Sequence, residues 1–155
     1  MIPLAERFWL KVDTDGPVSD YAPHLGPCWI WTASLDGTGY GKFSMGSRLD
    51  GTRKLHQAHR VAYELEVGPI PPGLELDHLC MVRRCVRPSH AEPCTSRVNT
   101  LRSPSAPTAI NARKTHCVHG HPLDGVKASG SRYCLTCNRD RVRALRARED
   151  CRAYG

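Results

Sequence analysis

Residues 74–90 read LELDHLCMVRRCVRPSH, and this stretch decides how the middle of the 155-residue chain folds. Apolar and polar residues alternate over residues 74–78, which is the pattern of a short β-strand. A loop rich in cysteine follows, and residues 91–94 are the expected partner strand. A helix is expected next; it begins at a cap formed by Thr95 or Ser96 and contains Asn99. The expected order is strand, loop, strand and helix. The loop begins at Leu79 and is rich in residues that can bind metal, so we call it the metal-rich loop.

Two helices and a β-hairpin are predicted upstream of this stretch. Residues 4–12 form the first expected helix, and residues 56–67 form the second, which ends at Gly68-Pro69. Residues 28–32 and 39–45 have the composition of strands, and the turn at Asp36-Gly37 predicts that they pair as a hairpin. The first hundred residues therefore belong to the α+β class.

The C-terminal third has a different composition. Residues 103–108 are rich in serine and proline, which is typical of a linker, and residues 138–152 form an arginine-rich stretch expected to be helical. We expect a domain over residues 1–103, a linker over 104–116 and a small module over 117–155.

Cysteine and histidine are abundant, whereas large apolar residues are scarce. The chain has eight Cys, eight His, 13 Gly and 12 Pro, but only two Phe. Its hydrophobic core is therefore thin and needs additional stabilisation by disulfides or bound metal. No secretion signal is recognised at the N-terminus and no apolar run reaches membrane-spanning length. We therefore expect a reducing compartment, no membrane partner, and cysteine clusters that bind metal rather than form disulfides.

One metal-binding set lies in the C-terminal module. Cys117, His121, Cys134 and Cys137 together supply three thiolates and one imidazole, which is a closed tetrahedral set for Zn²⁺. His119 is a rival ligand, and His116 is a weaker one. Because a closed set has no open coordination position, we expect this zinc to be structural.

A second set lies in the central stretch. Cys80, Cys85 and His90 follow one another at equal spacing and supply three ligands. Cys28 is the preferred fourth ligand and Cys94 is the alternative. We therefore expect two structural zinc ions in each chain.

Positive charge is concentrated at the C-terminal end. Residues 104–155 carry ten Lys and Arg against four Asp and Glu, whereas residues 1–103 carry twelve against eleven. A basic tail on a nearly neutral body favours a nucleic-acid partner. The arginines that we expect to contact DNA phosphates are Arg60, Arg83, Arg84, Arg87, Arg139 and Arg143.

Three motifs in the central region closely resemble the HNH endonucleases encoded by bacteriophages and mobile elements. They are LDHLC at 76–80, RCVRPSH at 84–90 and RVNTLR at 97–102, and the similarity extends over most of the chain. The resemblance implies a ββα-metal fold around one divalent ion, with His78 as general base and with Asp77 and Asn99 as ligands of the ion. The fold class is then α+β, a ββα-metal nuclease core stapled by zinc and followed by a zinc module with a basic helix.

Two details of the resemblance affect the ligand assignment. The Cys80, Cys85 and His90 pattern is similar to the zinc site of His-Cys box homing endonucleases, which assigns His90 to zinc rather than to the catalytic ion. Many relatives carry Asn where this chain has Arg87. The loss of that Asn weakens catalysis if it braces the catalytic loop, and is harmless if Asn99 is the essential amide.

The residue types suit this chemistry independently of the family. A carboxylate at Asp77 and an amide oxygen at Asn99 are the hard ligands that Mg²⁺ or Mn²⁺ prefers. A neutral imidazole at His78 can accept a proton from water near neutral pH. Adjacent strand residues point to opposite faces, so Asp77 and His78 can act together only if the strand ends or bends there.

The sequence therefore predicts a metal-dependent DNA endonuclease that acts in the cytoplasm of a phage-infected bacterial cell. Two alternatives stay open: a zinc-dependent DNA-binding protein without catalysis, and an accessory that nicks DNA during phage genome packaging. Cutting both strands with one site per chain would suggest a homodimer.

Overall fold

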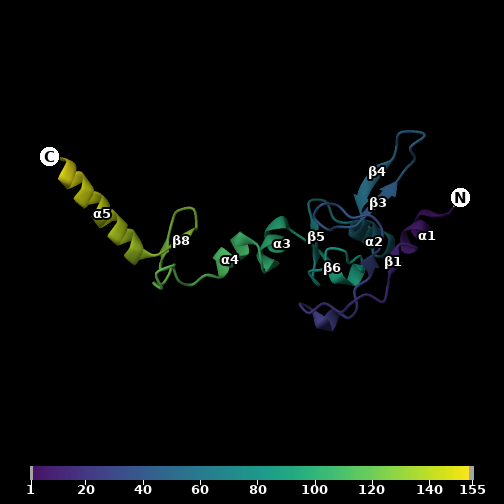
Figure 1. The fold of residues 1–155 in the computed structure, drawn as a ribbon, viewed down its shortest axis with the longest axis horizontal. Helices are drawn as coiled ribbons and strands as arrows, with labels where there is room; N and C mark the ends of the chain where they lie inside the picture. Colours follow the sequence, from purple (N-terminus) through teal and green to yellow (C-terminus); the bar gives the residue numbers. More distant parts are fainter. Residues whose placement is uncertain (1, 154–155) are drawn as a thin grey trace. The chain divides into compact units, whose positions relative to one another are not determined.

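The computed structural model describes residues 2–153, with side chains to residue 149. The chain divides into two compact units, residues 1–99 and 100–155, each of which is described by itself. Figure 1 shows the order of their elements along the chain. No helix in the described part is long and apolar enough to cross a membrane.

Three antiparallel strand pairs make up the β-structure of the first unit. Val12–Asp13 (β1) pairs with Ile30–Trp31 (β2), and Lys42–Met45 (β3) pairs with Lys54–Gln57 (β4). Glu75–His78 (β5) pairs with Ala91–Cys94 (β6), and the two lie side by side in Figure 1. The last pair confirms the strand, loop and strand that the alternation in residues 74–94 predicts.

Helices connect and follow these strand pairs. They are Leu4–Trp9 (α1), Ala58–Glu66 (α2) and Ser96–Arg102 (α3), with short 3₁₀ turns at Pro23–Leu25 (η1) and Pro88–His90 (η2). The hydroxyl of Thr95 accepts a hydrogen bond from the Val98 amide at 3.3 Å, so Thr95 caps α3. Helix α3 therefore follows β6 directly and contains Asn99 as predicted.

One predicted strand pairing is wrong, and one predicted helix begins later than expected. Residues 28–32 and 39–45 do not pair as a ladder, because β2 pairs with β1 and β3 pairs with β4. Among the described residues, the only β-bridge between the two sides of the turn is a single antiparallel one, between Leu35 and Gly41. The Asp36-Gly37 turn exists, but its carboxylate accepts hydrogen bonds from the amides of Thr38 and Tyr40 and closes a local loop instead. The helix expected over 56–67 begins only at Ala58, since β4 occupies the preceding residues.

The core of the first unit is small and aromatic. It gathers the side chains of Phe8, Trp31 and Phe43 around the buried face of α2, and the ring centroids of Phe8 and Trp31 lie 5.0 Å apart. Gly41 is required at its edge, because a Cβ there would lie 2.6 Å from Cδ1 of Trp31. Truncating an aromatic residue in such a core typically costs about 3–5 kcal/mol. This core holds α2 against the strands that precede it.

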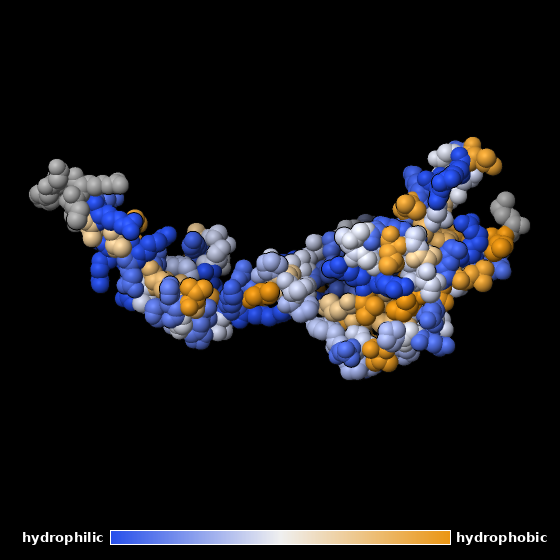
Figure 2. All heavy atoms as spheres, in the orientation of Figure 1, coloured by the Kyte–Doolittle hydropathy of each residue, from blue (hydrophilic) through white to orange (hydrophobic). Residues whose placement is uncertain are grey.

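The second unit contains two helices and a short strand pair. Pro107–Arg113 (α4) lies within the segment 104–116 that we expect to be a linker, so part of that segment is helical. Gly125–Val126 (β7) pairs with Arg132–Tyr133 (β8), and Leu135–Ala153 (α5) follows. Helix α5 includes the arginine-rich stretch predicted to be helical, and hydrophilic residues cover most of its visible face in Figure 2.

Candidate active site and metal sites

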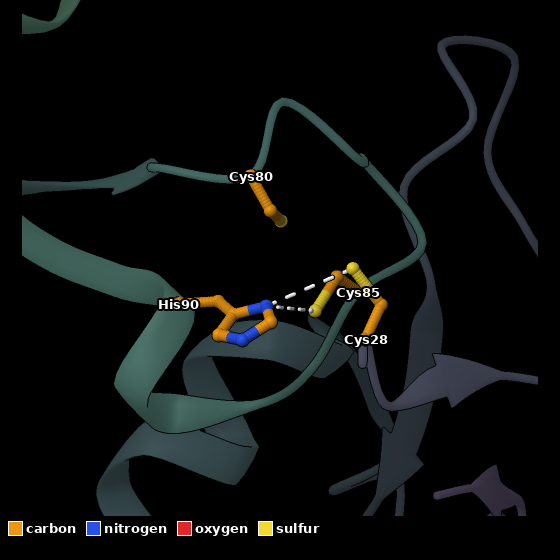
Figure 3. Close-up of side chains that lie close together, drawn as sticks. All are labelled: Cys28, Cys80, Cys85 and His90. Atoms are coloured by element: carbon orange, nitrogen blue, oxygen red, sulfur yellow. Dashed lines mark hydrogen bonds between the residues drawn. The ribbon is translucent and has the colours of Figure 1, made fainter. Parts of the chain in front are cut away.

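Four buried metal-ligand side chains meet in the first unit. Cys28 precedes β2, Cys80 and Cys85 lie in the loop after β5, and His90 ends η2. Their sulfur and nitrogen atoms all lie within 4.8 Å of one another, and Figure 3 shows the side chains turned toward a common point. The structure thus groups Cys28 with the central set, whereas Cys94 lies on β6 opposite Glu75.

The geometry of this cluster suits a tetrahedral zinc ion. Zinc bonds of the usual length place a sulfur and a nitrogen ligand about 3.6 Å apart. The Sγ atoms of Cys28 and Cys85 lie 3.7 and 3.6 Å from Nδ1 of His90. The Cys85 thiol beside it lowers the pKa of Cys80 to about 5, which favours the thiolate that binds metal.

Neighbouring backbone groups orient these ligands. The Nε2 atom of His90 lies 2.9 Å from the carbonyl oxygen of Leu25, to which an Nε2–H donates. That tautomer leaves Nδ1, the atom nearest the sulfurs, available as a ligand. The Ser19 hydroxyl donates to the Cys80 carbonyl at 2.6 Å and ties the N-terminal segment to the loop.

A second cluster forms in the C-terminal unit from Cys117, His121, Cys134 and Cys137. The Sγ atoms of Cys117 and Cys137 are 3.8 Å apart, and Nδ1 of His121 lies 3.3 Å from Sγ of Cys137. Gly120 allows the tight turn that brings Cys117 and His121 together, since its φ of +78° favours glycine. The rival ligand His119 is not part of this cluster. Each of the two predicted sets can therefore hold a metal ion.

Cys85 belongs to the first metal cluster and also contacts His78. His78 ends β5 and is buried, and its Nε2 lies 3.0 Å from the carbonyl oxygen of Cys85. An Nε2–H donates to this carbonyl, so Nδ1 carries the free lone pair. Burial lowers the pKa of His78, and the imidazole is therefore neutral at neutral pH. A neutral, oriented imidazole has the properties of a general base.

Glu75, Asp77 and Asn99 are associated with the same strand. Glu75 and Asp77 are two residues apart on β5 and so face the same side of it. The Asn99 side-chain amide donates to the Glu75 carboxylate at 2.8 Å, which leaves the Asn99 carbonyl oxygen Oδ1 for another partner. No motif in the sequence singles out Glu75, although its spacing of two residues from Asp77 is a signal for a shared face.

Two further rings, outside the site residues expected from the sequence, contact His78. The ring centroids of His59 and Tyr40 lie 4.6 and 5.6 Å from that of His78. His59 belongs to α2 and Tyr40 to the loop before β3, so no local spacing connects them with β5.

Three of the arginines expected to contact DNA brace the metal-rich loop. Arg83, Arg84 and Arg87 donate to the backbone carbonyls of Thr38, Trp31 and Pro27 at 2.8, 3.1 and 2.7 Å. A guanidinium carries five N–H donors, so these bonds leave others for a phosphate.

The remaining candidates lie on helices. Arg60 lies in the first turn of α2. Arg139 and Arg143 line one hollow of about 500 Å³ along α5, together with Arg146. Arg146 was not singled out from the sequence, but its helical spacing from Arg139 and Arg143 places the three on one face.

Comparison with known proteins assigns the central region. Residues 56–101 match the family model described as HNH endonuclease. The chain is 35% identical over 65 residues to the uncharacterized gene 5.3 protein of Enterobacteria phage T3, which covers 42% of this chain. It is 33% identical over 73 residues to protein 7.7 of Escherichia phage T7, which covers 47% of this chain. The matched regions span 64% and 52% of the length of these relatives. No solved structure matches the chain.

The matched segment runs from β4 to α3. It contains the oriented imidazole of His78, the neighbouring carboxylate of Asp77 and the amide of Asn99. Three of the four residues of the buried metal cluster also lie in it. Residues 56–101 are therefore similar to the HNH endonuclease family, and the chain is similar to proteins of two phages.

Proposed function

We propose that the protein is a metal-dependent DNA endonuclease in which His78 is the general base. The observation that carries this proposal is the double use of Cys85. Its side chain belongs to the buried metal cluster, while its carbonyl oxygen lies 3.0 Å from Nε2 of His78. Filling the metal cluster would thus hold the base in its working tautomer. This coupling suits an enzyme better than a protein that only binds DNA.

His78 would remove a proton from the attacking water through Nδ1. Its lowered pKa keeps the ring unprotonated near neutral pH, so no proton has to leave before it can act. The same ring can return the proton to solvent after the phosphodiester bond has been cut. Nδ1 is the atom assigned to this step because Nε2 is engaged by the Cys85 carbonyl.

Asp77 and Asn99 would hold the divalent ion. Both offer oxygen atoms, which Mg²⁺ and Mn²⁺ prefer, and the Glu75 carboxylate turns the Asn99 amide so that Oδ1 is the available atom. When bound, the ion supplies positive charge to the scissile phosphate and the leaving oxygen. The ββα-metal fold is supported by the β5, β6 and α3 order, in which these side chains lie on one strand and the following helix.

Two zinc ions would complete the fold. Both clusters have three cysteines and one histidine, and both are closed sets that leave no position for substrate. We therefore propose that both zinc ions are structural and that their binding contributes directly to folding.

The DNA partner is supported by charge as well as by family. The basic stretch over residues 104–155 and the Arg139, Arg143 and Arg146 face of α5 suit a phosphate backbone. A DNA-binding protein without catalysis and a nicking accessory of phage packaging are the alternatives. The first lacks cleavage altogether, and the second cuts only with a partner protein.

A comparison of two variants tests the assigned roles. Asn99→Ala should weaken the ion site, so its lost cleavage should return in part as the magnesium concentration rises. His78→Ala should lose cleavage by about 10²–10⁴-fold at every magnesium concentration, because more ion does not replace a base. His56→Ala is the matched control. His56 is also a histidine, but it lies on β4 opposite Phe43 and is not part of the proposed site. The assignment is wrong if both variants respond to magnesium in the same way.

A further inference from the structure

We propose that His59 is a positioning residue for His78: together with Tyr40, its ring fixes the orientation of the His78 imidazole. This inference rests on the proposed role of His78 as base, but it concerns the geometry of the ring rather than the reaction.

A single hydrogen bond does not hold an imidazole in one orientation. Rotation about the Cβ–Cγ bond of histidine has a broad, roughly two-fold preference. A flip of the ring would exchange Nδ1 with a ring carbon on the side where the base must act. The bond from Nε2 to the Cys85 carbonyl anchors one corner of His78, so other contacts must restrain the ring plane.

Two rings supply such contacts. His59 lies against His78 at 4.6 Å between centroids with an interplanar angle of 67°, and Tyr40 lies at 5.6 Å with an angle of 51°. Tyr40 and His59 also contact each other, at 5.5 Å. The three rings thus form a closed set, and because they come from three separate segments they can hold the His78 ring from more than one side.

The segment that carries Tyr40 is itself held firmly. The Asp36 carboxylate accepts hydrogen bonds from the Tyr40 amide and from the Thr38 amide and hydroxyl, and lies 3.2 Å from the Lys42 ammonium group. Arg83, from the metal-rich loop, lies over the Tyr40 ring and donates to the Thr38 carbonyl. Tyr40 is therefore fixed to the same loop that carries the Cys85 carbonyl.

His59 does not stabilise the fold at its position on α2. Among the described residues, its Nδ1 is the only buried side-chain nitrogen or oxygen without a hydrogen-bond partner. An unpaired buried polar atom destabilises a fold, and the neighbouring buried residues of α2 include Ala58, Val61 and Ala62, which carry no polar side-chain atom. The contact of its flat ring with His78 explains why a histidine stands at this position despite the stability lost through the unpaired nitrogen.

Nitrogen NMR of the histidine side chains and steady-state cleavage kinetics test the inference on the full-length protein. In the wild type, His78 should be a single tautomer protonated at Nε2. His59→Ala should give a mixture of tautomers, and kcat should fall by about 10- to 100-fold while KM for DNA and zinc content stay unchanged. His59→Phe keeps a ring beside His78 and should recover most of kcat. His56→Ala, the control, should match the wild type.

Several outcomes separate this inference from the proposed function. A wild type that cuts no DNA, but whose His78 tautomer depends on His59, would support the positioning role while the nuclease proposal fails. An active wild type whose kcat and tautomer are unchanged by His59→Ala would overturn it. A His59→Phe variant as slow as His59→Ala, with the His78 tautomer intact, would also overturn it, because the His59 nitrogen would then act directly. If His59→Ala does not fold, Tyr40→Leu should release the same ring, and an unchanged tautomer there would contradict the inference.

Discussion

His59 is a neutral imidazole over the whole ordinary pH range, and this has a consequence for stability. Burial is the largest cause, and together with the neighbouring His78 and Arg60 it lowers the pKa of His59 to about 3. An unfolded chain restores the ordinary pKa of 6.5. Between these two values the unfolded state binds a proton that the folded state does not bind. The free energy of unfolding must therefore fall as the pH falls below 6.5.

Urea unfolding of the wild type and of His59→Phe at about pH 5 and about pH 7 measures this effect. The wild type should lose up to about 1.4 kcal/mol per pH unit more than the variant, because only the wild type carries the buried imidazole. Acid also protonates the cysteine ligands, but both proteins share that loss. Equal pH dependence in the two proteins would show that His59 is protonated in the folded state.

Among the elements of the fold, the loop between β5 and β6 contributes both to the metal cluster and to the proposed active site. Its cysteines and the end of η2 form three corners of the metal cluster, and Cys28 brings the N-terminal segment to the fourth. The same loop supplies the carbonyl that orients His78 and the arginines that donate to the backbone of residues 27–38. Loss of the metal should therefore affect the active site as well as the fold.

Cysteine variants should reveal this coupling. Cys28→Ser should lower the zinc content from two ions to one and reduce cleavage strongly, because the Cys85 carbonyl loses its fixed position. Cys94→Ser is the matched control: Cys94 is also buried, but it lies outside the cluster and should keep both zinc ions. Elemental analysis and a cleavage assay give the two readouts. The reverse pattern, in which Cys94 is needed and Cys28 is not, would contradict the ligand set.

The parts of the fold that local signals determine were predictable from the sequence. Alternation gave β5 and its partner, Thr95 gave the cap of α3, and cysteine spacing gave most of both clusters. The hairpin prediction failed because a turn signal at Asp36 does not determine which strands pair over long distances. The ring contacts of Tyr40 and His59 with His78 could not be predicted either, since they depend on tertiary packing between separate segments.

At the scale of the whole molecule, chemistry and charge are divided along the chain. The proposed base and ion ligands lie in residues 1–99, which are nearly neutral, whereas most of the net charge of +7 lies in the C-terminal third. Helix α5 has arginine on more than one face and exposes most of its described side chains. Up to residue 149, the side chains of this helix do not form part of a hydrophobic core and suit a polyanion instead.

The salt dependence of DNA binding tests this division. Changing Arg139, Arg143 and Arg146 to Gln removes three positive charges from α5. The slope of log K against log salt should become shallower by about 0.9 for each phosphate that α5 no longer neutralises, because fewer counterions are released. Titrations of a labelled duplex at several salt concentrations measure the slope. A slope equal to that of the wild type would mean that α5 does not bind the DNA backbone.

Cleavage of a supercoiled plasmid shows whether this chain cuts DNA with His78 as the base. Wild-type protein that contains two zinc ions should nick or linearise the plasmid with magnesium or manganese, and EDTA should stop the reaction. His78→Ala, with the same zinc content and the same affinity for DNA, should be slower by at least about 10²-fold. A wild type that binds the plasmid and leaves it intact with either ion, or a His78→Ala variant that cuts at the wild-type rate, would contradict the proposed function.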